Sequence, residues 1–299
     1  MTPTATTPRP PVADGPPATV VPAPVDPLVP PARADRQGHL WSDALVFAGR
    51  HVEHIRQIPE KLLDVTLQPL MFVVLFSYVF GGAISVGQGS YREYIVPGVL
   101  IQTIAFGLMG PGISIANDLT EGVVDRFRTL PVHRYAYLLG HFLAELGGLV
   151  VAMTLLLGAG LAVGWRVHTD VGHVLGAFAL VLLFTSAMVW LGTLVGLMVR
   201  SSDAVMGVAF MLVFPLTFLS SAFVPVATLP SALQWVAGWN PITAMVGAVR
   251  ELFGNPMPPV ERHTWLTDNP VAGAAGISLL ILVAAFTASI HRYRTRTAD

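Results

Sequence analysis

Hydrophobic and polar residues follow one another along this chain in long blocks. Six stretches are predominantly apolar, and each is near the roughly 20 residues that a helix needs to cross a ~30 Å hydrocarbon core. Lipid offers the backbone no hydrogen-bond partner, so each stretch is predicted to be helical. The predicted spans cover residues 63–84, 95–116, 137–163, 172–199, 204–225 and 271–290.

The pattern differs in the first 61 residues. Residues 1–38 hold eleven of the 24 prolines and show no apolar period, which predicts a disordered cytoplasmic tail, because such a segment buries too little surface to offset its ordering entropy. Residues 39–61 mix apolar side chains such as Trp41 with charged ones such as Arg50, which predicts an amphipathic helix in the membrane interface. Residues 62–299 are then one transmembrane domain.

The link between the fifth and sixth predicted spans, at about residues 226–270, is longer than the others and not uniformly polar. Its apolar residues recur at near-helical spacing, and Asn240-Pro241 interrupts them, because proline lacks an N–H donor and restricts the residue before it. Two short helices that dip back toward the membrane are therefore predicted. Whether they form an outer lid or simply pack against the outer leaflet stays open.

Composition and charge fit a membrane protein and give it an orientation. Only 12% of residues are charged, about half of the ~25% typical of soluble domains. With the N-terminus inside, thirteen of the seventeen Lys and Arg residues fall on the cytoplasmic side and four, at positions 92, 166, 250 and 262, on the outer side. The positive-inside rule then predicts a multi-pass protein of the cell membrane with both termini in the cytoplasm.

Motifs for chemistry within the chain are missing. There is no Gly-x-x-x-x-Gly-Lys loop, because Ile58-Pro59-Glu60 precede Lys61, the only lysine, and so no P-loop is present. The absence of cysteine excludes disulfides and thiol catalysis. No metal cluster and no nucleic-acid-binding pattern is recognised. We expect neither an enzyme nor a cofactor-binding protein.

Some polar residues lie inside the predicted spans. Ionisable groups there are functional candidates, and His141 and Glu145, four residues apart on one helix face, form either part of a substrate or proton path or a partly hydrated pair that orients the helix. Gly192-x-x-x-Gly196 fits close helix packing. The neutral candidates for a transport path are Gln68, Tyr78, Gln102, Thr103, Ser220 and Ser221.

The segment between the second and third spans is the most specific. Its sequence, Glu121-Gly-Val-Val-Asp-Arg-Phe-Arg-Thr-Leu-Pro131, closely resembles that of the ABC-2 type permeases, and best the daunorubicin-resistance (DrrB-like) export permeases. Phe76-Ser-Tyr-Val-Phe-Gly-Gly82, Tyr94-Ile-Val-Pro-Gly98 and Asn240-Pro241 also resemble the family. The resemblance runs from about residue 41 to the C-terminus.

The resemblance implies a membrane dimer that works with two separately encoded ATPase subunits, which bind ATP and Mg²⁺. The segment 117–131 would include the coupling helix that docks on the ATPase, and residues 39–61 would be the connecting helix beside it. Substrates in the family are amphipathic drugs, antibiotics, glycolipids or polysaccharides moved outward. The implied coupling residues are Glu121, Gly122, Asp125, Arg126, Arg128 and Pro131.

Other classes of protein are weighed against the exporter permease. An ion-coupled secondary transporter would place carboxylates or broken helices near the midplane, and only Glu145 is close to such a position. A membrane-embedded enzyme or scaffold lacks supporting motifs. The sequence does not select the substrate, nor does it tell a homodimer from a heterodimer.

Overall fold

The computed structural model describes residues 59–82, 84, 86, 89–123, 135–199, 201–258 and 263–295, together with Leu45 and Gly49. Every regular element among these residues is a helix, as the apolar pattern predicts. The predicted tail at 1–38 and the coupling residues beyond 123 lie outside the described residues. So does most of the predicted interfacial helix at 39–61, of which helix α2 contains only the last three residues.

Four of the described helices are long and apolar enough to cross a membrane. Two shorter apolar helices, Leu67–Phe80 and Ser202–Phe218, fall in the regions of the first and fifth predicted spans. The elements in chain order are α2 (Pro59–Leu75), the π-helix η1 (Phe76–Phe80), α3 (Tyr91–Phe106), α4 (Met109–Thr120), α6 (Ala136–Val163), α7 (Val171–Met198), α8 (Ser202–Phe218), η2 (Val226–Thr228), α9 (Ser231–Gly238), α10 (Pro241–Phe253), α11 (Trp265–Asp268) and α12 (Pro270–Thr295).

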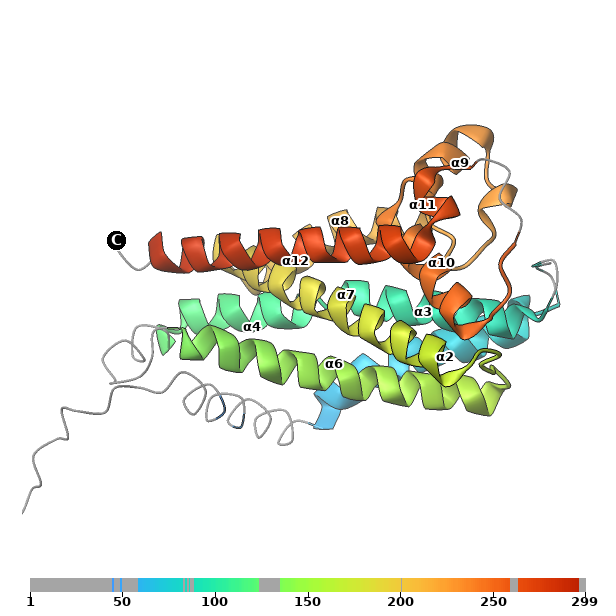
Figure 1. Cartoon of the computed structure of the whole chain (residues 1–299). Coiled ribbons are helices and arrows are strands. Elements are labelled where there is room, and N and C mark those ends of the chain that lie inside the picture. The colour runs from blue at the N-terminus through green and yellow to red at the C-terminus, as the bar shows by residue number, and fades with distance from the viewer. Residues whose placement is uncertain are drawn as a thin grey trace, which may run out of the picture. The chain divides into compact units, whose positions relative to one another are not determined.

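The second predicted span, 95–116, lies within the apolar region Tyr91–Thr120, which is long enough to cross a membrane. It consists of α3 and α4, which follow each other in line and are separated by a turn at Gly107 and Leu108 (Figure 1). Pro111 lies in the first turn of α4 and has no N–H to donate to the carbonyl of Gly107, which favours an interruption at this point. α3 itself continues through Pro97.

The fifth predicted span, 204–225, extends too far. α8 ends at Phe218, and residues 219–222 turn instead of continuing the helix. A residue distant in the sequence holds this turn. The Asn240 side chain donates to the carbonyls of Leu216 (2.6 Å) and Leu219 (2.9 Å). Asn240 also caps α10 by accepting from Ile242, and Pro241 is the first residue of that helix. α9 and α10 thus meet at Asn240-Pro241.

α7 is the central helix of the bundle and packs against α4, α6, α10 and α12 (Figure 1). It begins at Asp170, whose carboxylate accepts from Gly172 and contacts His173, and this interaction lowers the pKa of Asp170 below its usual range. Its contact with α4 is a backbone contact. A Cβ added at Gly192 would overlap the carbonyl of Leu108, and one at Gly196 would overlap that of Gly112. Small residues are what allow two helices to approach this closely.

Candidate functional site

One end of the bundle carries the segment that resembles a coupling loop. α4 ends at Thr120, and exposed Glu121 is its C-cap, with an N–H that donates to the carbonyls of Asn117 and Leu119. Gly122 follows with a φ of +67°, in the left-handed region that glycine adopts without strain. The chain therefore leaves the helix abruptly at Gly122. Asp125, Arg126, Arg128 and Pro131 lie outside the described residues.

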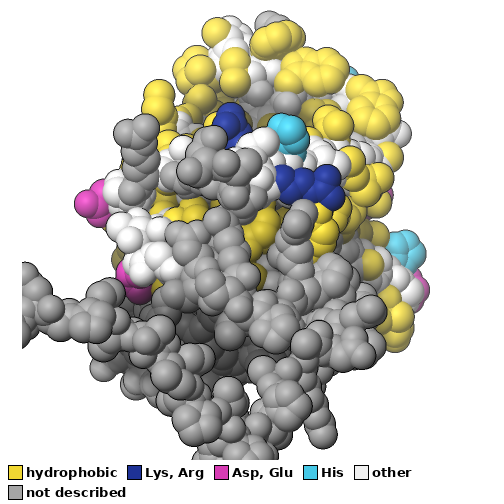
Figure 2. Space-filling model, turned by 90° about the vertical axis from the view of Figure 1, so that its left-hand side faces the viewer, with side chains coloured by type: hydrophobic (Ala, Val, Ile, Leu, Met, Phe, Trp, Pro, Cys, Tyr) yellow, Lys and Arg dark blue, Asp and Glu magenta, His cyan; other side chains and the backbone are white. Residues whose placement is uncertain are grey.

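Side chains at this end join α4 to the helices beside it. The Tyr137 hydroxyl of α6 donates to Asp118 of α4 at 2.5 Å, and the Tyr137 ring stacks on Tyr293 of α12 at 6.4 Å. Arg294 donates to the Tyr135 hydroxyl at 2.7 Å, just where the described chain resumes. Seen from this end, charged side chains lie among hydrophobic ones (Figure 2). A force applied next to Glu121 would thus act on three helices.

His141 and Glu145 lie on α6 within the membrane-spanning region. His141 is buried, at 4% exposure, and stacks against Tyr137 with ring centroids 6.3 Å apart. Glu145 is partly exposed and faces α4, since a Cβ built on Gly110 would lie 3.1 Å from its Oε2 atom. Both side chains therefore lie at the contact of α6 with its neighbours. Their role in a substrate or proton path stays a prediction.

The predicted transport residues lie on different elements of the described structure. Gln68 and Tyr78 are exposed, on α2 and on η1. Gln102 is 8% exposed on α3 and makes no hydrogen bond to a described residue, whereas the neighbouring Thr103 hydroxyl donates to the carbonyl of Val99 within its own helix. A lined cavity or an inter-subunit contact at the Gln102 amide stays a prediction.

Ser220 and Ser221 lie past the end of α8 and belong to its terminal turn. The Ser220 hydroxyl donates to the carbonyl of Thr217 at 2.5 Å and accepts from the N–H of Ala222 at 3.1 Å. The carbonyl of Ser221 accepts from the Tyr94 hydroxyl at 2.7 Å. Their polar groups are thus used to hold the turn.

Arg250 of α10 is the polar residue that sequence reasoning missed. It is only 2% exposed, and no described carboxylate pairs with it. Its guanidinium donates to the carbonyls of Tyr94 and Ser221, each at 2.9 Å, and its Cζ lies 3.5 Å from the centre of the Tyr94 ring. Burial lowers the pKa of this arginine from its usual value, although arginine remains charged in proteins. Arg250 thereby ties α10 to α3 and to the turn after α8.

A signal for this burial was present in the sequence. Arg250 stands four residues after Val246 and three before Phe253, on the same stripe of the helix, and both of those side chains are buried. A cation on an otherwise apolar stripe indicates an internal site. Counting it as an outer-loop charge was the error.

Residues 45–253 match the ABC-2 type transporter family. The chain belongs to this family. It is a multi-pass membrane protein, and its relatives are permease subunits of ABC transporters.

Several relatives are drug-resistance permeases by name. The daunorubicin resistance ABC transporter permease protein DrrB1 of Streptomyces coeruleorubidus is 32% identical over 215 residues, which cover 72% of this chain and 73% of the relative. The doxorubicin resistance permease DrrB of Mycobacterium tuberculosis is 27% identical over 49% of this chain and 53% of its own length. The putative transport permease ycf38 of Cyanophora paradoxa is 25% identical over 81% of this chain and 84% of its own.

Proposed function

We propose that this chain is the permease subunit of an ABC exporter that moves an amphipathic drug, antibiotic or lipid-like molecule out of the cell. Family membership and the drug-resistance names of the relatives support this function. The observation that carries it is the position of the coupling-like segment, which begins directly at the exposed end of α4. The chain has no P-loop lysine, so ATP and Mg²⁺ would be bound by a partner ATPase.

The proposed assembly has two permease subunits and two ATPase subunits. Exposed apolar side chains on α2 and α8, for example Met71, Phe210 and Met211, are suited to lipid or to a second permease. In this assembly α2 with η1, and α8, also cross the bilayer, which gives six spans. The end that carries Glu121 faces the cytoplasm, and α9, α10 and α11 lie at the outer face as a re-entrant segment.

The mechanism follows from the packing of α4. ATP-driven closure of the ATPase subunits moves the segment 117–131. α4 transmits the movement because Tyr137 binds Asp118 and because Gly192 and Gly196 of α7 lie against the backbone at the start of α4. The turn at Gly107 and Leu108 lets α4 move relative to α3. Interfaces that switch between discrete packings are a general means of transmitting such movements.

The test reverses the charge of Glu121. In Glu121→Lys we expect normal membrane insertion, loss of co-purification with the ATPase encoded beside its gene, and loss of doxorubicin efflux. Glu251→Lys is the matched control, because Glu251 is an exposed acid on α10, away from the coupling end. Wild-type complex formation and efflux by Glu121→Lys would contradict the proposal.

Two further outcomes would assign another function. Efflux that persists without ATP and collapses with the proton gradient would indicate an ion-coupled carrier. Efflux of a polysaccharide or glycolipid in place of the drug would keep the ABC mechanism and change the cargo.

A further inference from the structure

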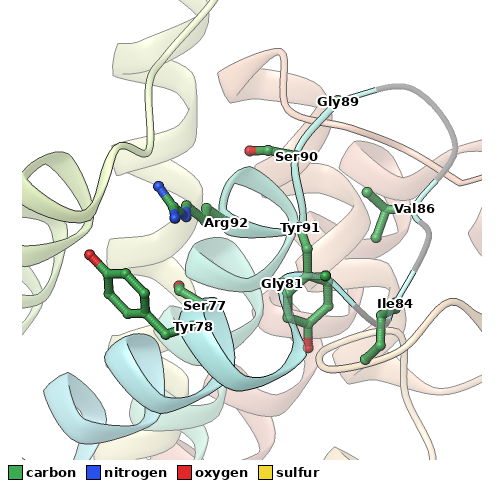
Figure 3. A pocket seen from close by; sticks show the side chains of 10 residues that line it. Ser77, Tyr78, Gly81, Ile84, Val86, Gly89, Ser90, Tyr91 and Arg92 are labelled. Atoms are coloured by element: carbon green, nitrogen blue, oxygen red, sulfur yellow. The ribbon is translucent and has the colours of Figure 1, made fainter.

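A pocket of about 390 Å³ opens at the end of the bundle opposite the coupling segment. It lies between the π-helix η1 and the beginning of α3 (Figure 3). The continuous apolar region Tyr91–Thr120 is 30 residues long, which is roughly 45 Å of helix, so Arg92 and Glu121 lie at opposite ends of one span. Ser77, Tyr78, Ser90 and Arg92 supply the pocket with polar groups.

Ser77 is the unusual residue of this pocket. It is 2% exposed, and its Oγ atom has no hydrogen-bond partner among the described residues. Serine and threonine hydroxyls inside helices normally donate to the carbonyl four residues earlier. Eight described hydroxyls do so here: Thr103, Thr120, Thr154, Thr185, Ser186, Thr193, Thr217 and Thr287. Ser77 does not, and its hydroxyl points toward the space below Arg92 (Figure 3).

Arg92 supplies a cation whose donors are not used by the described protein. Its Cζ lies 5.1 Å from the centre of the Tyr78 ring, and no described carboxylate pairs with it. The nearby Glu93 is engaged by His168 at 2.9 Å. Arg166 is a second exposed arginine near this end. Its Nη1 atom donates hydrogen bonds to the carbonyls of Leu161 (2.6 Å) and Trp165 (2.7 Å). Among the described residues that line the pocket, Arg92 therefore supplies a cation with donors free to receive a ligand.

Backbone N–H groups at the start of α3 also favour an anionic ligand in this pocket. Ser90 is the N-cap of α3, and its oxygens accept from the N–H groups of Glu93 and Tyr94. The N–H groups of Tyr91 and Arg92 bind no described acceptor and belong to the positive end of the helix. Tyr78 is 64% exposed and presents an aromatic face at the rim. These groups suit a ligand with an anionic head group next to an apolar or aromatic body.

We propose that this pocket binds the carboxylate or phosphate head of an amphipathic molecule, with the head at Arg92 and Ser77 and the body against Tyr78. A π-helical turn is costly in isolation and occurs often at functional sites, which agrees with its position here. Only the role of this pocket as a cargo site on the exit side rests on the proposed function. Binding can be measured without ATPase and ATP, so its failure is distinct from a failure of coupling.

The test uses the full chain in phosphatidylcholine nanodiscs and two probes, dansyl-undecanoic acid and its neutral primary amide. Dansyl emission excited through the tryptophans, corrected for empty discs, reports binding. We expect the acid to bind about tenfold more tightly than the amide, as for a charge-assisted hydrogen bond. Arg92→Gln should abolish this preference and Arg92→Lys should keep most of it. Arg166→Gln is the matched control and should leave it unchanged.

Ser77→Ala should weaken binding of the acid about three- to tenfold without a loss of folded protein, because its hydroxyl has no internal partner to lose. Equal binding of acid and amide by the wild type, or a preference that survives Arg92→Gln, would overturn the proposal. Discs in which phosphatidylglycerol replaces part of the phosphatidylcholine identify the source. Arg92-dependent competition by that lipid supports a lipid head group as the ligand, and absence of competition supports a free amphipathic molecule.

Discussion

At the scale of the residue, Arg250 carries the clearest prediction about stability. Arg250→Met keeps the length of the side chain but removes its hydrogen bonds to the carbonyls of Tyr94 and Ser221. Because a hydrogen bond from a charged group contributes about 1.5–3 kcal/mol, we expect a loss of folding free energy of that order. Thermal unfolding of the purified chain in detergent measures it.

Arg166→Met is the control for Arg250. Arg166 is exposed and donates to carbonyls at and just after the end of α6, so we expect a change within about 0.5 kcal/mol. Equal unfolding temperatures for the two variants would show that Arg250 is not a structural tie.

The hydrogen-bond partners of Arg250 could not be predicted from the sequence. The carbonyls that bind Arg250 come from residues 156 and 29 positions away in the chain, and carbonyls are present at every residue. No side-chain pattern marks them in advance. Asn240 is similar: its place before Pro241 indicated a break between two short helices, but its bonds to the end of α8 depend on the tertiary fold. Ser220 and Ser221 were consequently assigned to a span that ends before them.

At the scale of the element, the contact between α4 and α7 depends on glycine. In Gly192→Leu the new side chain would overlap the backbone of Leu108, and backbone cannot move aside as a flexible side chain can. Overpacking of this kind costs about 1–3 kcal/mol, occasionally more, so we expect a lower unfolding temperature and a loss of efflux. The amount of folded chain and the rate of doxorubicin efflux are the measurements.

Gly158→Leu on α6 provides the comparison for Gly192. Gly158 is exposed and has open space where a Cβ would lie, so its substitution should be tolerated. If both variants behaved like the wild type, close packing of α4 on α7 would not be needed for export.

The end of α4 gives a second prediction at this scale. Gly122 has a positive φ, and a β-branched residue there is strained by roughly 1–2 kcal/mol. We expect Gly122→Val to redirect the chain after Glu121 and to reduce ATPase binding, while Gly122→Asn, which tolerates this conformation, retains it. Co-purification with the ATPase distinguishes the two. If Gly122→Val bound the ATPase as well as the wild type, the backbone conformation at the end of α4 would not be needed for ATPase binding.

The helices that were predicted correctly are those whose bounds follow from hydropathy alone. The spans predicted at 137–163, 172–199 and 271–290 agree closely with α6, α7 and α12, because each is one uninterrupted apolar run. The interruption at Gly107 and Leu108 was not predictable from hydropathy, since both residues are compatible with an apolar helix. The π-helical turn of η1 is likewise invisible to an apolar pattern, and it is what shapes the pocket at Ser77.

At the scale of the whole molecule, the described structure has four long apolar helices and two shorter ones. α8 has 17 residues and a length of roughly 26 Å, slightly less than a ~30 Å hydrocarbon core. The turn that follows it and local thinning of the bilayer would allow α8 to cross in the proposed topology. The six-span topology with both termini in the cytoplasm is therefore a prediction about the assembled membrane protein, and accessibility from either side of the membrane tests it.

The chain has no cysteine, so single-cysteine variants can be labelled in intact cells without a mutated background. We expect His263→Cys and Gly82→Cys to react with a membrane-impermeant maleimide from outside. Ser201→Cys and Arg294→Cys should react only after permeabilisation, because the proposed topology places the ends of α7 and α12 on the cytoplasmic side. Reaction of Ser201→Cys from outside would show that α8 does not cross the membrane and would leave a topology of fewer than six spans. Reaction of Arg294→Cys from outside would reverse the orientation and place the coupling segment beyond the reach of any cytoplasmic ATPase.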